Sequence, residues 1–74
     1  MRNIYYVNPR LFSWEIKKQN GNRAIKICDT KKEACDFARK IAKNNEPSQV
    51  VVKKKDGTIE TEWTYGNDPF PPLG

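Results

Sequence analysis

Short segments in which apolar and polar residues alternate fill the first 28 positions of the chain. Ile4–Val7 is aromatic and β-branched, and an Asn-Pro pair ends it, as is typical of a strand. Ser13–Lys18 and Arg23–Cys28 alternate with the period of two of half-buried strands. Gln19–Asn22 between them contains Asn-Gly, the strongest short signal for a hairpin turn. These segments predict a three-stranded antiparallel meander.

The same alternation assigns side chains to the two faces of the predicted sheet. Trp14 and Ile16 fall together on one face of the second segment, which we expect to be buried. In the third segment, Ile25 and Ile27 share one face and leave Cys28 on the other. We therefore expect Cys28 to point away from any helix that covers the sheet.

Residues 30–43 carry the pattern of an amphipathic helix. Thr30 precedes Glu33 by three positions, which is the spacing of a capping box at a helix start. Asn44–Asn45 are expected to end the helix in a left-handed conformation, and Pro47 blocks its continuation. Apolar residues follow the spacing of a single buried stripe, which consists of Ala34, Phe37, Ala38, Ile41 and Ala42.

A hairpin is predicted after the helix. Val50–Val52 is strongly β-prone, and the Asp-Gly pair at 56–57 favours a two-residue turn. Such a turn would pair Lys53 with Glu60 across the hairpin. Its buried face would hold Val50, Val52, Ile59 and Trp63. The fold class is therefore predicted as α+β in the order βββαββ, with an antiparallel three-stranded meander, one amphipathic helix packed on one sheet face, and a C-terminal β-hairpin.

Two parts of the chain differ in composition. Residues 1–65 are expected to form a single α+β domain, and residues 66–74 a proline-rich C-terminal tail that is neither helix nor strand. We expect the tail either to cover the core through Phe70 and Leu73 or to bind a partner through the spacing of Pro69 and Pro72.

Several short motifs in this order resemble a known family. They are the Tyr-x-Val-x-Pro of 5–9, the Trp-x-Ile of 14–16, the Asp-Thr-Lys-x-Glu-Ala of 29–34, the Asp-Gly of 56–57 and the closing Tyr-Gly-Asn-Asp-Pro-Phe-Pro-Pro-x-Gly of 65–74. The chain resembles the bacterial domain-of-unknown-function family 2188 along nearly its whole length. The resemblance implies a bacterial or phage origin and carries no activity.

The composition narrows the possible chemistry. The 74 residues include no histidine, which excludes histidine-based acid–base catalysis and histidine-ligated metal sites. Cys28 and Cys35 are seven apart, which is not a recurring metal spacing, and we expect two independent structural thiols. We therefore expect a protein that is not an enzyme and that has no catalytic residues, no metal and no cofactor. The absence of a signal-peptide pattern at the N-terminus and of a long apolar segment favours a cytoplasmic protein that does not bind membranes.

Charge suggests a function. The chain holds 14 Lys and Arg against 9 Asp and Glu, a net charge of +5, and all the basic residues lie before residue 56. Such residues can neutralise the phosphates of DNA or RNA without reading sequence. The candidate nucleic-acid-binding residues are Lys31, Lys32, Arg39, Lys40, Lys43, Lys53, Lys54 and Lys55. Two alternatives stay open: a merely solvated basic surface, and a protein-interaction module or homodimer acting through a sheet edge or the proline-rich tail.

Overall fold

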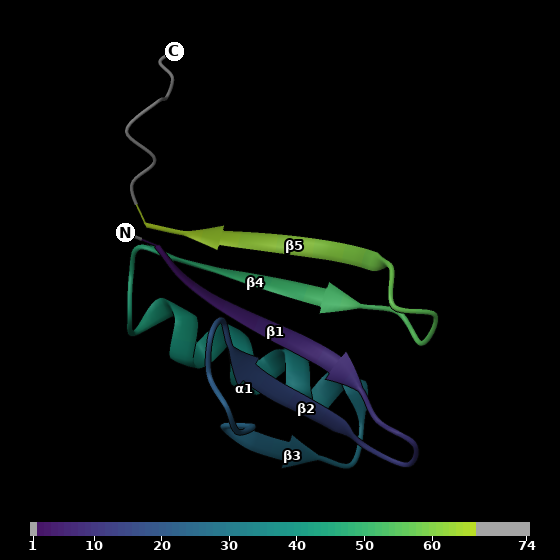
Figure 1. Cartoon of the computed structure of the whole chain (residues 1–74). Coiled ribbons are helices and arrows are strands. Elements are labelled where there is room, and N and C mark those ends of the chain that lie inside the picture. Colours follow the sequence, from purple (N-terminus) through teal and green to yellow (C-terminus); the bar gives the residue numbers. More distant parts are fainter. Residues whose placement is uncertain (1, 67–74) are drawn as a thin grey trace.

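The computed structural model describes residues 2–66, which form one helix lying across one face of a five-stranded sheet (Figure 1). The sheet has the strand order β3-β2-β1-β4-β5, and α1 packs against all five strands. The elements are β1 (Asn3–Pro9), β2 (Trp14–Lys18), β3 (Lys26–Cys28), α1 (Lys31–Lys43), β4 (Ser48–Lys53) and β5 (Ile59–Tyr65). The α+β class and the element order βββαββ are confirmed. The face of the sheet opposite α1 is called the open face below.

The sheet is mixed rather than antiparallel throughout. The meander of β1, β2 and β3 and the hairpin of β4 and β5 are joined by a parallel pairing of β1 with β4, which places Val7 opposite Val52. The predicted arrangement lacked this pairing. It arises because α1 carries the chain back along the sheet, so β4 starts at the same end as β1 and runs in the same direction.

The core lies between α1 and the sheet. Ala34, Ala38 and Ala42 are fully buried, and their small side chains let the helix approach the strands closely. Phe37 and Ile41 pack at the margin of this cluster, so the predicted helix stripe is confirmed. The sheet contributes the buried residues Tyr5, Val7, Ile16, Cys28, Val50 and Val52.

The helix begins as predicted and ends differently. The Glu33 amide donates to the Thr30 hydroxyl oxygen at 3.1 Å, which confirms Thr30 as the N-cap. At the other end, Asn44 has a φ of −82°, so the predicted left-handed conformation is wrong. The Asn45 side chain instead donates to the Ile41 carbonyl at 2.7 Å, which satisfies a carbonyl of the last turn without a left-handed residue.

The orientation of β3 was predicted wrongly. Cys28 lies directly opposite Trp14, so both side chains share the face that α1 covers, and Cys28 is only 7% exposed. Ile25 and Ile27 consequently fall on the open side of the sheet, where they are 46% and 47% exposed. Alternation gave the period of the strand correctly, but the pairing with β2 decides which set of side chains is buried.

The C-terminal hairpin also corrects the predicted pairing. The Gly57 amide donates to the Lys54 carbonyl at 2.9 Å, Lys54 pairs with Thr58, and Gly57 has a φ of +90°. These features define a three-residue loop rather than a two-residue turn. Lys53 therefore lies opposite Ile59 and not opposite Glu60, and Ile59 leaves the buried face.

A β-bulge then restores the predicted register. The pairing shifts between Val52 and Lys53, and Glu60 is the extra residue on β5. Beyond it, Val52 faces Thr61 and Val50 faces Trp63, as the sequence predicted. The loop is one residue longer than predicted and the bulge adds one residue on β5, so together they return the two strands to the predicted register.

Two predictions, on membrane spans and on the C-terminal tail, can be compared with the described residues only in part. Within residues 2–66, no helix is long and apolar enough to cross a membrane. The prediction of a proline-rich tail concerns residues 67–74 almost entirely, which lie outside the described residues.

Candidate nucleic-acid interface

The outer surface of α1 gathers three of the predicted basic residues. Arg39, Lys40 and Lys43 line a surface hollow of about 310 Å³ together with Asp36. They come together because positions three and four apart lie on the same side of a helix. The Asp36 carboxylate accepts from Lys32 at 3.0 Å, so the one acidic residue that lines this hollow within residues 2–66 already has a cationic partner. The three residues Arg39, Lys40 and Lys43 are called the helix cluster below.

Arg39 is the most firmly held member of the helix cluster. Its guanidinium carbon lies 4.5 Å from the centre of the Trp63 ring, within the range of a cation–π interaction. Its Nε donates to the Tyr65 hydroxyl at 2.6 Å. Trp63 and Tyr65 are two residues apart on β5 and therefore face α1 together. The two terminal nitrogens of the guanidinium are not used by these contacts and can donate to an anion.

The other basic residues of α1 differ in how far their neighbours engage them. Lys43 lies over the Tyr65 ring, with its Nζ 5.7 Å from the ring centre, and remains exposed. Lys31 makes an ion pair with Glu60 and lies 5.8 Å from the centre of the Trp14 ring. Lys32 makes the ion pair with Asp36. Lys31 and Lys32 therefore contribute less free positive charge than their place on the helix suggests.

The structure separates Lys53, Lys54 and Lys55 from the helix cluster. Lys53 projects from the open face, where its Nζ lies 5.1 Å from the centre of the Tyr6 ring. Lys54 and Lys55 are exposed in the loop between β4 and β5. The eight predicted residues thus fall into three groups, on the helix surface, on the open face and in the loop, and they do not form one continuous patch.

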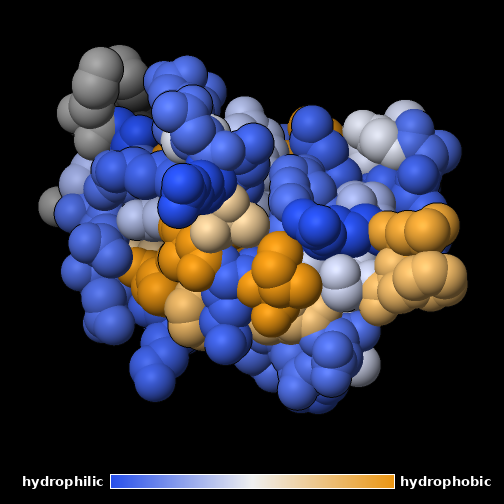
Figure 2. Space-filling model, turned by 60° about the horizontal axis from the view of Figure 1, so that its bottom comes forward, coloured by the Kyte–Doolittle hydropathy of each residue, from blue (hydrophilic) through white to orange (hydrophobic). Residues whose placement is uncertain are grey.

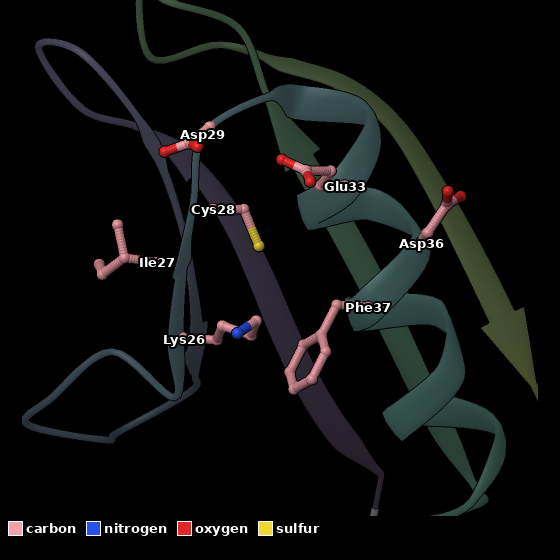
Figure 3. A pocket seen from close by; sticks show the side chains of 7 residues that line it. All are labelled: Lys26, Ile27, Cys28, Asp29, Glu33, Asp36 and Phe37. Carbon is pink, nitrogen blue, oxygen red and sulfur yellow. The ribbon is translucent and has the colours of Figure 1, made fainter.

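A second hollow, of about 410 Å³, lies between β3 and the first half of α1 (Figure 3). Lys26, Cys28 and Phe37 point into it, and the Lys26 Nζ lies 5.6 Å from the centre of the Phe37 ring. Ile27 points the opposite way, away from α1. Three acidic residues complete its lining, namely Asp29, Glu33 and Asp36. Within residues 2–66, no group of three or more acidic or cysteine side chains is arranged to hold a metal ion.

The two cysteines are separate thiols, as predicted. Both are free; Cys28 is buried in the core and Cys35 is partly exposed on α1. Burial raises the pKa of Cys35 above its ordinary value, although the nearby Lys31 ammonium acts in the opposite direction. A raised pKa keeps Cys35 in the thiol form at neutral pH, and the thiol is a poor nucleophile.

Trp63 and Tyr65 are the part of the site that the sequence prediction missed. The prediction assigned Trp63 to the core, and the structure packs it, half-buried, against the core; what the prediction lacked is that Arg39 covers its ring. The available signal was the spacing of two aromatic residues on one strand face. That spacing could have suggested an aromatic strip beside the helix, but it does not identify which helix residue covers the strip.

The family comparison covers most of the described residues. A family model described as an uncharacterised protein conserved in bacteria, DUF2188, matches residues 5–65. The match ends at Tyr65, so it does not test the resemblance of the closing tail. Neither a comparison with curated proteins nor one with solved structures gave a match.

Proposed function

The chain belongs to the bacterial family DUF2188, whose description assigns no activity, and we propose from the geometry of α1 that it is a non-enzymatic protein that binds nucleic acid. The helix cluster contacts backbone phosphates and does not read bases. Binding of this kind is independent of sequence and weakens steeply as salt is added, because each neutralised phosphate releases counterions. DNA and RNA are both candidate partners.

One observation supports this proposal above the others: among residues 2–66, the only acidic residue that lines the hollow of the helix cluster is already paired. Asp36 is engaged by Lys32, so Arg39, Lys40 and Lys43 keep their positive charge available. Arg39 is in addition oriented by Trp63 and Tyr65. A guanidinium that is already oriented loses less side-chain freedom when it binds a phosphate.

Paired substitutions test the proposal. Replacing Lys40 and Lys43 with glutamine should weaken binding to duplex DNA, single-stranded DNA and RNA alike. Two lost phosphate contacts should also flatten the slope of log affinity against log salt by about 1.8 for a duplex. Both side chains are exposed, and the ring contact of Lys43 with Tyr65 is at the surface, so the thermal midpoint should barely change. Fluorescence titrations at several salt concentrations measure the affinity and the slope.

The matched control removes the same charge elsewhere. Lys54 and Lys55 are exposed in the loop between β4 and β5, away from the helix cluster. Replacing these two with glutamine should change the slope by much less than the Lys40 and Lys43 pair. Equal effects of the two pairs would contradict a localised interface and would leave only the general attraction of a basic protein.

The first proposal would be refuted if the unaltered protein bound no nucleic acid at low salt. A second candidate function, interaction with another protein, is supported by the exposed edge of the sheet. The protein-interaction alternative would then be favoured, because β3 is an edge strand that carries the exposed Ile27 and follows the exposed Ile25.

A further inference from the structure

The outer edge of β5 offers more unpaired backbone than the other edge of the sheet. β5 spans seven residues and is the terminal strand next to β4, whereas β3 at the opposite edge has three residues. Figure 1 shows α1 behind the middle of the sheet, so within residues 2–66 no helix or loop covers the edge of β5. An exposed edge strand is a template for the addition of a further strand.

The direction of the backbone groups on β5 follows from the neighbouring pairings. Pro47 immediately precedes β4, and its carbonyl accepts from the first residue of β1 at 3.0 Å. Successive residues of a strand direct their backbone groups to opposite sides, so those of Val50, three positions later, point to β5, where Trp63 is the partner. Trp63 therefore bonds to β4, and its neighbours Glu62 and Thr64 direct their amides and carbonyls to the free edge.

The β3 edge presents fewer backbone groups to a further strand. The Gln19 amide donates to β1 at 2.8 Å, so Ile16, three positions earlier, directs its groups to β3, where Lys26 is its partner. By the same alternation Cys28 also bonds to β2, and within β3 only Ile27 keeps its backbone groups at the free edge. Figure 2 turns this side of the molecule forward and shows hydrophobic atoms in separate groups between hydrophilic ones. Strand addition is therefore favoured at β5.

The side chains of β5 are arranged so that the strand complements itself. Three of them are half-buried on the α1 side, namely Thr61, Trp63 and Tyr65. Glu62 and Thr64 alternate with these and are exposed on the open face. An antiparallel pair of β5 strands centred on Trp63 would place Glu62 opposite Thr64 of the second copy. No acidic side chain of this stretch then lies opposite another, as a two-fold interface requires.

We propose that the chain forms a homodimer by antiparallel pairing of β5 with β5 of a second copy, centred on Trp63. Glu62 of each copy exchanges its backbone hydrogen bonds with Thr64 of the other. The two Trp63 residues meet at a non-hydrogen-bonded position, where cross-strand side chains lie closest and aromatic pairs stabilise a sheet. The sheet would continue through both molecules with the two copies of α1 on the same face. This interface does not depend on the proposed binding of nucleic acid.

The evident cost of this register is the approach of the two Arg39 side chains. Each guanidinium covers its own Trp63 ring at 4.5 Å, and its Nε donates to the Tyr65 hydroxyl of the same copy at 2.6 Å. Two positive charges near the two-fold axis repel each other, and salt screens that repulsion. The interface is also small. The dimer should therefore be weak, and it should strengthen as the salt concentration rises.

Sedimentation equilibrium of the whole chain up to about 1 mM tests the proposal, because even a weak association is populated at that concentration. The mass should rise with concentration from 8.6 kDa towards twice that value. Thr64→Pro removes an amide that points to the free edge and that β4 does not use, so it should weaken association by about tenfold or more. The matched control is Ile27→Pro, which removes the outward amide of the other edge strand and should leave association within about twofold of the unaltered protein.

Charges at position 64 test the register itself. This position lies opposite Glu62 of the second copy, and the two-fold axis makes the pair occur twice. Thr64→Lys should therefore strengthen association about fivefold, and Thr64→Glu should weaken it by a similar factor. The net charge of +5 alone predicts the reverse order, because an added lysine increases the repulsion between two basic copies. One exposed position thus separates a specific register from general charge effects.

Amide hydrogen exchange tests the pairing without any substitution. Exchange at Glu62 and Thr64 should slow as the protein concentration rises, whereas exchange at Ile27 should not change. Circular dichroism verifies that every variant is folded. The proposal would be overturned by a monomer at every concentration, by unchanged exchange at Glu62 and Thr64, by equal effects of the two proline variants, or by the reverse order of the two charged variants. None of these measurements includes nucleic acid, so their outcomes do not bear on the helix cluster.

Discussion

Replacing Trp63 with leucine would remove the aromatic surface beneath Arg39 while keeping an apolar side chain on β5. A cation–π interaction stabilises by about 0.5–1 kcal/mol when exposed and by about 2 kcal/mol when desolvated. Arg39 and Trp63 are both half-buried and lie 4.5 Å apart, so we expect a coupling of about 1 kcal/mol. A 74-residue domain has a stability of about 4–11 kcal/mol at the usual value per residue, so the variants should remain folded.

A double-mutant cycle isolates this coupling. Arg39→Met, Trp63→Leu and the double variant are unfolded in urea and followed by circular dichroism. Arg39→Met also loses the hydrogen bond to Tyr65, but that loss is present with or without Trp63 and cancels in the cycle. The control cycle replaces Lys40 with methionine, because Lys40 is a helix-cluster neighbour with no such contact to Trp63.

The two cycles give opposite expectations. The control should be additive within about 0.3 kcal/mol, as for independent residues. If the Arg39 cycle were equally additive, the stacked geometry would contribute nothing to stability. The argument that Arg39 is held ready for phosphate by Trp63 would then fail as well.

Two other predictions concern stability, one at the N-terminal end of α1 and one in the loop between β4 and β5. Thr30→Ala should cost about 1 kcal/mol, because the Glu33 amide loses its acceptor; an unchanged urea midpoint would show that the cap is dispensable. Hydrogen bonds from the Thr58 hydroxyl and amide lower the pKa of Asp56. The Asp56 carboxylate therefore stabilises the fold at pH values above the ordinary carboxyl pKa of about 3.9. This contribution is lost as the pH falls through the lowered pKa. Asp56→Asn should therefore be less stable than the unaltered protein at neutral pH and equally stable in strong acid, and a difference that persists in acid would contradict this origin.

The features that the sequence predicted correctly depend on neighbours in the chain. The Thr30 cap and the alanine stripe of α1 involve residues three or four positions apart, and both are confirmed. The paired positions Val50 and Trp63 were also correct, since alternation on the two strands constrained them. Local spacing is sufficient wherever the contact itself is local.

The errors arise where one local pattern permits two structures. An Asp-Gly pair is compatible with a two-residue or a three-residue loop, and this choice decides whether Ile59 is buried or exposed. In β3, alternation is compatible with either Cys28 or the isoleucines on the buried face, so the prediction placed the wrong set there, and pairing with β2 decides which set is buried. The stacking of Arg39 on Trp63 joins residues that no local rule connects.

The parallel pairing of β1 with β4 has a consequence for the order of folding. The meander and the hairpin are each built from strands close in sequence, whereas Val7 and Val52 meet only after the whole intervening chain has been ordered. Closing so long a loop costs entropy before any contact compensates for it, which slows folding. During synthesis, the meander and α1 emerge with one flank of the core still uncovered. Only the arrival of β4 completes that core, so the last third of the chain governs when the first strand becomes stably structured.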